Sequence, residues 1–469
     1  MTPPRSSHDL VAHLRELLPR YVRPLPRYTS YPTAPVWSEA FGARDFAAAL
    51  GRVAGDVALY AHVPFCRSLC HFCACNRMIT RDPALPARYV ETLAREVETV
   101  RALVPGDVRA AQLHLGGGTP THLDPAQLER VVGSLTAAFP LRPGAEVSIE
   151  VDPRVTTAEH VDALRRCGFD RVSLGVQDFE PAVQEAIHRV QPREVTAGLV
   201  DALRGAGIGS IAFDLIYGLP FQTVASFERT LAEVVALAPD RVAIYSYAHV
   251  TWVAKQQRGF ERKDLPDAAT KLDLFALALE RLIDAGYVYI GLDHFAKPSD
   301  ELARALDDGS LRRNFMGYTT QAGLDLVGFG PSAISELAGC YAQSHRELDA
   351  WEGAVDAGGL ATLRGHALDA ADEERRFLIA RVLCQGAIDA ADASARFGAS
   401  FAERHADALR RLAPMERDGL VVLAADGSLR LTPEGRVLAR NVAAVFDAYL
   451  TDGEAAGAEG APRRFSQSV

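Results

Sequence analysis

The sequence predicts an α/β fold built on a parallel sheet, followed by a smaller, mainly helical C-terminal domain. Six short apolar runs recur along the first half of the chain, and amphipathic stretches of helical periodicity separate them. From about residue 370 the pattern changes to helices followed by a hairpin. Because the connections are long enough for right-handed crossovers, consecutive strands are expected to run parallel.

The six expected strands are rich in apolar and β-branched residues, as strands buried on both faces of a parallel sheet are. Six β/α units fit either a doubly wound sheet or an incomplete (β/α)6 barrel, and periodicity alone does not separate the two. The expected strands cover residues 57–63, 111–117, 146–151, 171–177, 210–219 and 241–247.

The regions outside these strands complete the expected organisation. Residues 24–37 are rich in proline and tyrosine, which predicts an extended segment that either lies on the rest of the protein or is a plain linker. From about residue 370, helices and a strand–turn–strand pattern with an Asp-Gly turn are typical of a winged-helix-like unit. The expected units are an N-terminal helix and arm, 1–54; a barrel, 55–300; a barrel extension and connecting segment, 301–365; a C-terminal helical domain, 366–451; and a flexible tail, 452–469.

The composition limits the class of protein. The chain has 469 residues with 50 Lys and Arg against 60 Asp and Glu, a formal charge of -10, which disfavours nucleic acid or an anionic membrane as partner. No secretory signal and no run of about 18 apolar residues occurs, so we expect a cytoplasmic protein without a membrane partner. Four of the seven cysteines fall within ten residues, which indicates a metal-ligand cluster rather than a disulfide framework.

The cysteine cluster follows the first expected strand with the spacing Cys66-x3-Cys70-x2-Cys73-x-Cys75. One interpretation is a structural zinc site, which normally has four protein ligands and often two separated cysteine pairs. The favoured interpretation is a 4Fe-4S cluster held by three thiolates, which leaves one iron open for an exchangeable ligand. Cys75 stays open as a fourth ligand.

Polar residues and glycines mark the ends of the next expected strands, where ligand sites of parallel α/β folds form. Each has a simpler interpretation: the glycine-rich end of the second strand as a tight turn, and the carboxylates as buried groups satisfied by backbone or arginine. Their common position at one edge of the sheet favours a ligand site. They are Gly116, Gly117, Gly118, Thr119, Glu150, Gln177, Asp178, Arg189 and Asp214.

The CxxxCxxC loop after a first strand resembles the signature of the radical S-adenosylmethionine (SAM) superfamily. The resemblance implies an incomplete parallel barrel in which Cys66, Cys70 and Cys73 hold a 4Fe-4S cluster. It also implies that S-adenosylmethionine binds the open iron and is cleaved reductively to a 5'-deoxyadenosyl radical, so the cofactor supplies the difficult chemistry.

A closer resemblance rests on segments spread over most of the chain. They are PRYTSYPTA (26–34), YAHVPFCRSLCHFCACN (60–76), EVDPR (150–154), GVQDF (175–179), DLIYGLP (214–220), YAH (247–249), DHFA (293–296), RNFMGYTTQ (313–321) and GPSAIS (330–335). Together they resemble the oxygen-independent coproporphyrinogen III oxidases, also called coproporphyrinogen dehydrogenases. The departures are small: Ala74 stands where members often carry glycine, and Pro331 where a more flexible residue is common.

This resemblance implies an oxidoreductase of haem biosynthesis that converts two propionates of coproporphyrinogen III to vinyl groups, giving protoporphyrinogen IX. It implies two S-adenosylmethionine molecules, an external electron donor and acceptor, and a monomer. The first S-adenosylmethionine is expected near Tyr60, Gly117, Glu150 and Ile334, and the second near Phe72, Gly118, Thr119, Gln177, Arg189, Asp214 and Ala248, with core packing as the alternative role of the two aromatic residues.

Tyr60 is also expected to be catalytic, together with the three cluster cysteines. Because the substrate carries anionic propionates, Arg27 and Arg313 are the cations expected to contact it. The alternative function is a haem chaperone on the same fold, whose members lack the PRYTSYP segment at 26–32. A DNA-binding regulator and a radical methyltransferase are disfavoured further alternatives.

Overall fold

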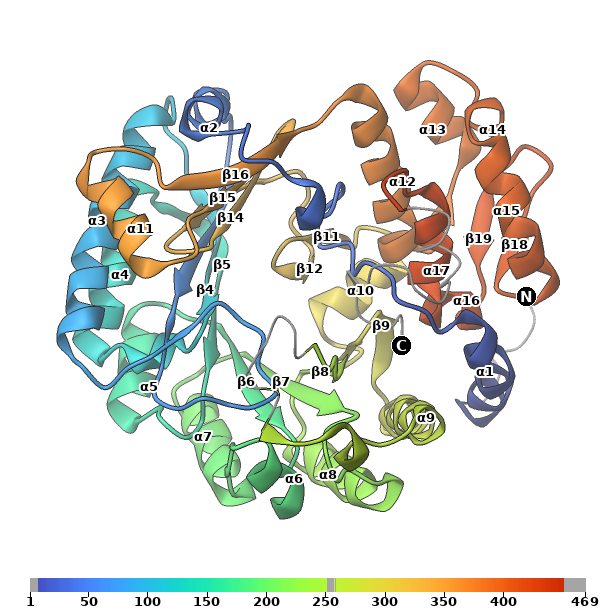
Figure 1. Cartoon of the computed structure of the whole chain (residues 1–469), viewed down its shortest axis with the longest axis horizontal. Helices are drawn as coiled ribbons and strands as arrows, with labels where there is room; N and C mark the ends of the chain where they lie inside the picture. Colours follow the sequence, from blue (N-terminus) through green and yellow to red (C-terminus); the bar gives the residue numbers. More distant parts are fainter. Residues whose placement is uncertain (1–6, 251–256, 258, 451–469) are drawn as a thin grey trace.

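A computed structural model describes residues 7–250, 257 and 259–450, so the tail expected over 452–469 lies outside the described residues. Its centre is a 12-stranded sheet in which the six expected strands are parallel neighbours in chain order. The open, curved sheet confirms the incomplete barrel (Figure 1). The six strands are β1 Val57–Val63, β4 Ala110–Gly117, β5 Leu141–Val151, β6 Arg171–Gln177, β7 Ser210–Tyr217 and β8 Arg241–Ser246.

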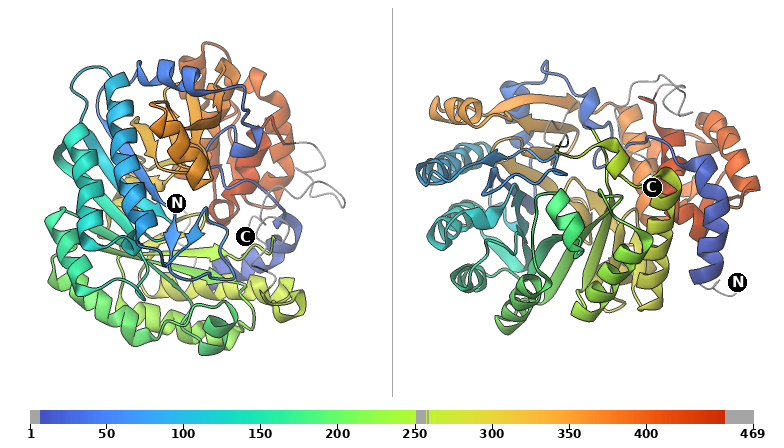
Figure 2. Two further views of the ribbon diagram at one scale, coloured as in Figure 1. Left: turned by 60° about the vertical axis from the view of Figure 1, so that its left-hand side comes forward. Right: turned by 60° about the horizontal axis from the view of Figure 1, so that its bottom comes forward.

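Helices connect these strands and cover the outside of the sheet (Figures 1 and 2). Several begin at a side-chain cap, as when Asp124 accepts a hydrogen bond from the Gln127 amide and Thr223 accepts one from Ser226. The connecting helices are α3 Ala84–Leu103, α4 Pro125–Ala138, α5 Ala158–Arg166, α6 Pro181–Ala186, α7 Arg193–Gly205 and α8 Val224–Leu237.

Further strands extend the sheet at both edges. Beside β1 lies a parallel strand, β13 Asp325–Phe329, followed by three antiparallel ones. Beyond β8 lie two short antiparallel strands that precede and follow a tight turn. The additions are β14 Ile334–Leu337, β15 Cys340–Ser344, β16 Thr362–Ala367, β9 Val288–Gly291 and β10 His294–Ala296. The sheet therefore ends at β16 on one side and at β9 on the other.

Smaller elements surround the two edges. A two-residue pair, β2 Phe65–Cys66 and β3 Met78–Ile79, frames the cysteine loop, and a hairpin of β11 Arg312–Asn314 and β12 Gly317–Thr319 lies near the C-terminal domain. The helices of this part are α9 Ala268–Asp284, α10 Glu301–Asp307 and α11 Leu348–Asp356.

The C-terminal region is mainly helical and contains the expected hairpin, to which an additional strand pairs to give a three-stranded sheet. The Asp-Gly turn joins β18 Val421–Leu423 to β19 Leu429–Leu431, and β17 Ala387–Ile388 pairs with β19. The helices are α12 Ala370–Gln385, α13 Ala390–Phe397, α14 Phe401–Arg404, α15 Ala406–Arg417, α16 Pro433–Val437, α17 Ala439–Ala443 and the 3-10 turn η5 Ala444–Phe446.

The N-terminal arm crosses the open side of the barrel and is not a plain linker (Figure 1). Helix α1 Ser7–Tyr21 packs against α9 and α16, and the chain then passes through η1 Ala34–Val36 to α2 Ala43–Leu50, which packs against α3 and β16. Ser38 forms an isolated bridge with Gly365 of β16. The arm therefore links the two ends of the sheet.

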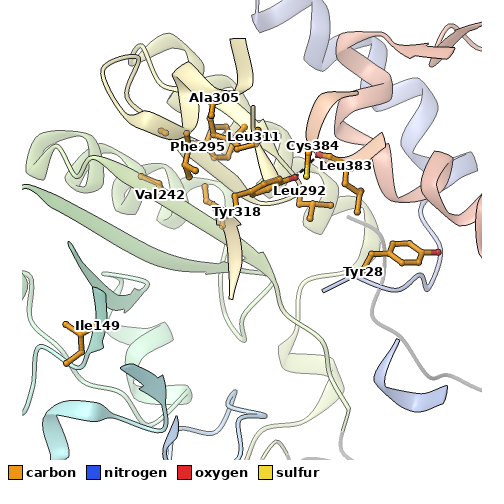
Figure 3. Close-up of a cluster of buried hydrophobic side chains, with 14 of the residues drawn as sticks. Tyr28, Ile149, Val242, Leu292, Phe295, Ala305, Leu311, Tyr318, Leu383 and Cys384 are labelled. Atoms are coloured by element: carbon orange, nitrogen blue, oxygen red, sulfur yellow. Dashed lines mark hydrogen bonds between the residues drawn. The ribbon is translucent and has the colours of Figure 1, made fainter. Parts of the chain in front are cut away.

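The hydrophobic core is continuous from the barrel into the C-terminal domain. Figure 3 shows the junction, where the Tyr318 hydroxyl donates a hydrogen bond to the carbonyl oxygen of Leu383 in α12 at 3.1 Å. Along the described stretches of the chain, none of the helices combines the length and apolarity needed to cross a membrane.

Candidate active site

A cavity of about 600 Å³ opens at the carboxyl ends of the parallel strands and brings together most of the expected site residues. The result follows from topology, because parallel strands end at one edge of their sheet. The expected residues that line the cavity are Arg27, Cys66, Cys70, Phe72, Cys73, Gly117, Gly118, Thr119, Glu150, Gln177, Arg189, Asp214 and Ala248.

The cysteine loop follows β1, and its cysteines, none of which is in a disulfide, line the cavity. The Cys66 Sγ lies 3.4 Å from the Thr119 Oγ1, and the Cys75 amide donates to the Cys73 Sγ at 3.4 Å. The hydrogen bond from the Cys75 side chain lowers the pKa of Cys73 to about 6, whereas burial raises that of Cys66 to about 11. Donors directed at sulfur favour the thiolate, the form that binds iron.

The donor set fits a 4Fe-4S cluster. Two guanidinium groups, those of Arg154 and Arg189, lie 3.6 Å from the Cys70 Sγ and can offset thiolate charge. In the described residues, no three His, Cys, Asp or Glu side chains converge as ligands of a single ion. In a four-iron cluster each thiolate binds a different iron, so the ligand sulfurs surround the cluster and need not converge on a single ion.

An ion-pair network behind the loop was missed by the sequence analysis. The Asp152 carboxylate accepts hydrogen bonds from Arg154 at 2.6 Å and from Arg189 at 3.1 Å. Burial alone would raise the pKa of Asp152, but the two arginines hold it below its usual range. Arg189 also donates to the Gly175 carbonyl oxygen at 2.7 Å. Asp152 and Arg154 belong to the EVDPR segment, so their signal was present in the sequence.

The glycine-rich end of β4 is a close approach between two chain segments rather than a mere tight turn. A Cβ on Gly118 would lie 2.8 Å from the Phe65 carbonyl oxygen, and Gly117 has φ +117°. The Gly117 amide donates to the Glu150 Oε2 at 3.1 Å. Only glycine allows β4 to approach the cysteine loop this closely.

Two carboxylates with different proton affinity face the cavity. Burial acts to raise the pKa of Glu150, but hydrogen bonding and charge from His114, with the Gly117 amide, lower it. Asp214 accepts a hydrogen bond from the Ser173 hydroxyl at 2.9 Å, and burial followed by the Glu150 charge raises its pKa to about 7. One carboxylate is therefore charged at neutral pH while the other is partly protonated.

Several expected residues, among them Gly116 and Asp178, lie outside the lining of this cavity. The Tyr60 hydroxyl lies 3.0 Å from the His62 Nδ1, and the Tyr60 ring stacks on that of His114. Ile334 is buried with Trp37 and Tyr341, and the Arg313 guanidinium lies 5.2 Å from the centre of the Tyr318 ring. Phe72 lines the cavity and also packs against a small cluster of buried apolar residues.

Arg27 reaches the cavity from the N-terminal arm. Its guanidinium pairs with Asp293 and lies 5.2 Å from the centre of the Tyr245 ring. Burial, together with the neighbouring Arg313 charge, lowers its pKa. The sequence analysis did not single out Tyr245, which lines the cavity, because no local pattern distinguishes it from other aromatic residues at strand ends.

Sequence comparisons agree with this geometry. The Radical SAM superfamily profile matches residues 60–234, and the HemN C-terminal domain profile matches residues 368–438. The oxygen-independent coproporphyrinogen III oxidase of Escherichia coli (strain K12) is 43% identical over 435 residues, which cover 92% of this chain and 95% of the relative. The chain belongs to the oxygen-independent coproporphyrinogen III oxidase family.

Other family members give the same result. The protein of the same name from Bradyrhizobium diazoefficiens is 44% identical over 432 residues, covering 92% of this chain and 96% of that one. The solved structure of coproporphyrinogen III oxidase (HemN) from Escherichia coli, described as a radical SAM enzyme, superposes with a TM-score of 0.88 at 42% identity. The superposed region covers 90% of this chain and 98% of the Escherichia coli chain. Membership implies a radical SAM oxidoreductase with a 4Fe-4S cluster and S-adenosylmethionine, and it does not favour the haem chaperone.

Proposed function

We propose that this enzyme converts two propionate side chains of coproporphyrinogen III to vinyl groups without oxygen, giving protoporphyrinogen IX. The observation that carries the proposal is one cavity with the three thiols of the CxxxCxxC loop at one wall and the Arg27 guanidinium at another. Family membership at 41–44% identity supports the same substrate. When bound, the cluster and S-adenosylmethionine supply a 5'-deoxyadenosyl radical that takes a hydrogen atom from a propionate β-carbon.

The electron balance of each reaction cycle determines which electron-transfer partners the enzyme needs. A propionate that has lost a hydrogen atom must lose carbon dioxide and one electron to become a vinyl group. We therefore propose an external electron donor for the cluster and a separate acceptor for the substrate electron. We further propose that the enzyme works in the cytoplasm as a monomer, which gel filtration with light scattering and cell fractionation test.

The chain's own residues bind and orient the reactants in this proposal. Cys66, Cys70 and Cys73 hold the cluster. Thr119 and Arg189 contact two of these sulfurs and belong to the proposed site of the second S-adenosylmethionine. The charged Glu150 carboxylate, fixed by the Gly117 amide, holds a cationic or hydroxyl group of the cofactor. Tyr60 supports Glu150 through the His114 stack.

The remaining roles complete the proposed site. Asp214 binds a second S-adenosylmethionine together with Phe72, Gly118, Gln177 and Ala248, all of which line the same cavity. Ile334 packs at the side of the first. Arg27, held by Asp293 and Tyr245, binds a substrate carboxylate. The volume of about 600 Å³ lies in the range of small-molecule sites.

The experiment is anaerobic. The cluster is reconstituted, S-adenosylmethionine, reductant and coproporphyrinogen III are added, and 5'-deoxyadenosine and porphyrin masses are followed by chromatography. The expected result is the loss of two carboxyl groups as about two equivalents of 5'-deoxyadenosine form, one for each hydrogen abstraction. Cofactor cleavage without loss of substrate carboxyl groups would reject the substrate, and tight haem binding by the same sample would then favour the chaperone.

A further inference from the structure

Three aromatic side chains form a column between the cavity and the C-terminal domain. The rings of Tyr245 and His294 meet edge to face with centroids 6.2 Å apart, and those of His294 and Tyr318 do so at 5.4 Å. Tyr245 lies in β8, His294 in β10 and Tyr318 in β12. The imidazole of His294 is therefore fixed between two phenol rings.

An arginine lies on each end of this column. The Arg27 guanidinium carbon lies 5.2 Å from the Tyr245 ring centre, and that of Arg313 lies 5.2 Å from the Tyr318 ring centre. Arg27 pairs with Asp293. Within the described residues Arg313 has no ion pair, and its buried Nε and Nη1 have no hydrogen-bond partner. Because no carboxylate of the described residues pairs with it, the positive charge of Arg313 attracts an anion bound nearby.

Charges of both signs act inside the barrel. Burial and three cations, Arg313, Arg27 and Arg241, lower the pKa of His294 to about 3, so its imidazole is neutral. The acids Glu150 and Asp214 on β5 and β7 act on Tyr245, and they line a small cavity together with His294. A ligand carboxylate is therefore attracted next to His294, where the three cations act, and repelled next to the two acids.

The imidazole of His294 is available to a ligand. Neither of its ring nitrogens has a hydrogen-bond partner along the described chain, and it lines a second cavity of about 160 Å³. This cavity shares Glu150, Ser173, Asp214 and Tyr245 with the larger one, so the two are adjacent. It is too small for a tetrapyrrole but has room for a single side arm of one.

We infer that His294 donates a hydrogen bond to a carboxylate arm of the substrate, while Arg313 and Arg27 at the two ends of the aromatic column supply the attractive charge. The inference deepens the proposed function and rests on it. Arg313 lines neither cavity, so it acts through charge and through the orientation of Tyr318. The carbon atoms of the Tyr245 and Tyr318 rings would contact the methylene groups of the substrate's propionate side chain.

The test is equilibrium binding of coproporphyrin III, the stable oxidised form of the ring, to the anaerobically reconstituted enzyme by porphyrin fluorescence anisotropy. His294→Phe keeps an aromatic ring in the column but removes the donor, and His294→Gln keeps a donor. Loss of one hydrogen bond to a charged group predicts about tenfold weaker binding for His294→Phe, and Arg313→Ala is expected to weaken it similarly. His294→Gln should stay within about threefold of the wild type.

Two controls separate recognition from structural damage. The tetramethyl ester of the same porphyrin lacks the carboxylates, so every variant should bind it as the wild type does. Arg396→Ala removes a guanidinium that lies 5.0 Å from the Phe377 ring centre in the C-terminal domain, and it should leave acid binding unchanged. Circular dichroism and the Tm verify that each variant is folded.

The outcomes are distinct. If His294→Phe binds the acid porphyrin as tightly as the wild type, or if acid and ester binding weaken together, the inference is wrong while the proposed function stands. If the wild type turns over no coproporphyrinogen III and binds no coproporphyrin III, the proposed function fails and the inference fails with it.

Discussion

Arg440 of α17 donates a hydrogen bond from its Nε to the carbonyl oxygen of Pro26 at 3.0 Å, directly before Arg27 in the arm. The side chain is buried, and burial with the nearby Arg27 charge lowers its pKa to about 9. Asn441 donates to the Tyr21 carbonyl oxygen at 2.7 Å, and the Tyr28 hydroxyl donates to Asp447 at 3.0 Å. The C-terminal domain thus holds the arm that carries Arg27 into the cavity.

Arg440→Ala is expected to loosen the arm. Loss of its hydrogen bonds to buried carbonyl oxygens should cost about 3 kcal/mol of stability and leave those oxygens unsatisfied. We expect a lower Tm, faster proteolysis near residues 22–33 and a higher KM for the porphyrinogen, with S-adenosylmethionine binding little changed. The control is Arg410→Ala, which removes an exposed pair with Asp407. An arm as protease-resistant as that of the wild type would contradict the prediction.

A buried carboxylate in α3 makes the stability depend on pH. Glu96 accepts hydrogen bonds from the Gly330 amide at 2.7 Å and from the Trp351 Nε1 at 2.9 Å, and burial raises its pKa to about 7. Between the unfolded pKa of about 4.5 and the folded value, the native state binds more protons than the unfolded state. The contribution of Glu96 therefore falls as pH rises through this window and is constant above it.

Glu96→Gln removes this dependence. The stability of the wild type relative to the variant should fall by roughly 3 kcal/mol between pH 4.5 and pH 8, since one pKa unit corresponds to about 1.4 kcal/mol. Urea unfolding at several pH values measures the difference. For the control Glu39→Gln, at an exposed position, the difference in unfolding free energy from the wild type should not change with pH. A pH-independent difference for Glu96→Gln would disprove the prediction.

Gly118→Ala is expected to disrupt the contact between β4 and the cysteine loop. The new Cβ would lie 2.8 Å from the Phe65 carbonyl oxygen and 2.9 Å from the Pro64 carbonyl carbon, so the backbone must shift. We expect at least about tenfold weaker S-adenosylmethionine binding by isothermal titration of the reconstituted enzyme. Gly133→Ala, with open space around it in α4, is the matched control, and equal affinities for both variants would rule out the close-approach account.

The cluster prediction separates ligand cysteines from the others. Replacement of Cys70 by serine should reduce bound iron from about four per chain to less than one, since a hydroxyl is a poor ligand for iron–sulfur clusters. Cys66→Ser and Cys73→Ser should behave alike. Cys167→Ser, at a half-buried helix end outside the cavity, should keep its iron. Iron and sulfide analysis after reconstitution distinguishes these results, and a Cys70→Ser enzyme with full iron would refute the assignment.

The sequence predicted the fold where the local pattern was strong. The strand at 57–63 is almost wholly buried, so its apolar run was continuous. Strands β6 and β7 alternate between buried and half-buried residues but are still rich in apolar, β-branched residues. The first half of β5, which is partly exposed, was not predicted. The strands β13 to β16 were not individually predicted, because they are only four to six residues long and include half-buried positions. Short strands, whether parallel like β13 or antiparallel like β14 to β16, lack the long apolar run that marks the central strands of this sheet.

The parts of the site that could be predicted are those whose residue types and spacing point to one kind of chemistry. The spacing of Cys66, Cys70 and Cys73 has few other uses, and the family resemblance supplied the residues at the strand ends. His294 and Asp152 were passed over, because their importance depends on partners that lie far away in the chain. The roles of the site residues and the division of the chain into units stay predictions.

The arm has a consequence for the order of synthesis. Residues 21–28 leave the ribosome well before their hydrogen-bond partners at residues 440–447, which lie more than 400 positions later. A segment cannot dock before its partner exists, and contacts so distant in sequence form slowly. The barrel can therefore fold while the open side of its cavity is still uncovered, and a nascent or truncated chain lacks the clamp that brings Arg27 into place.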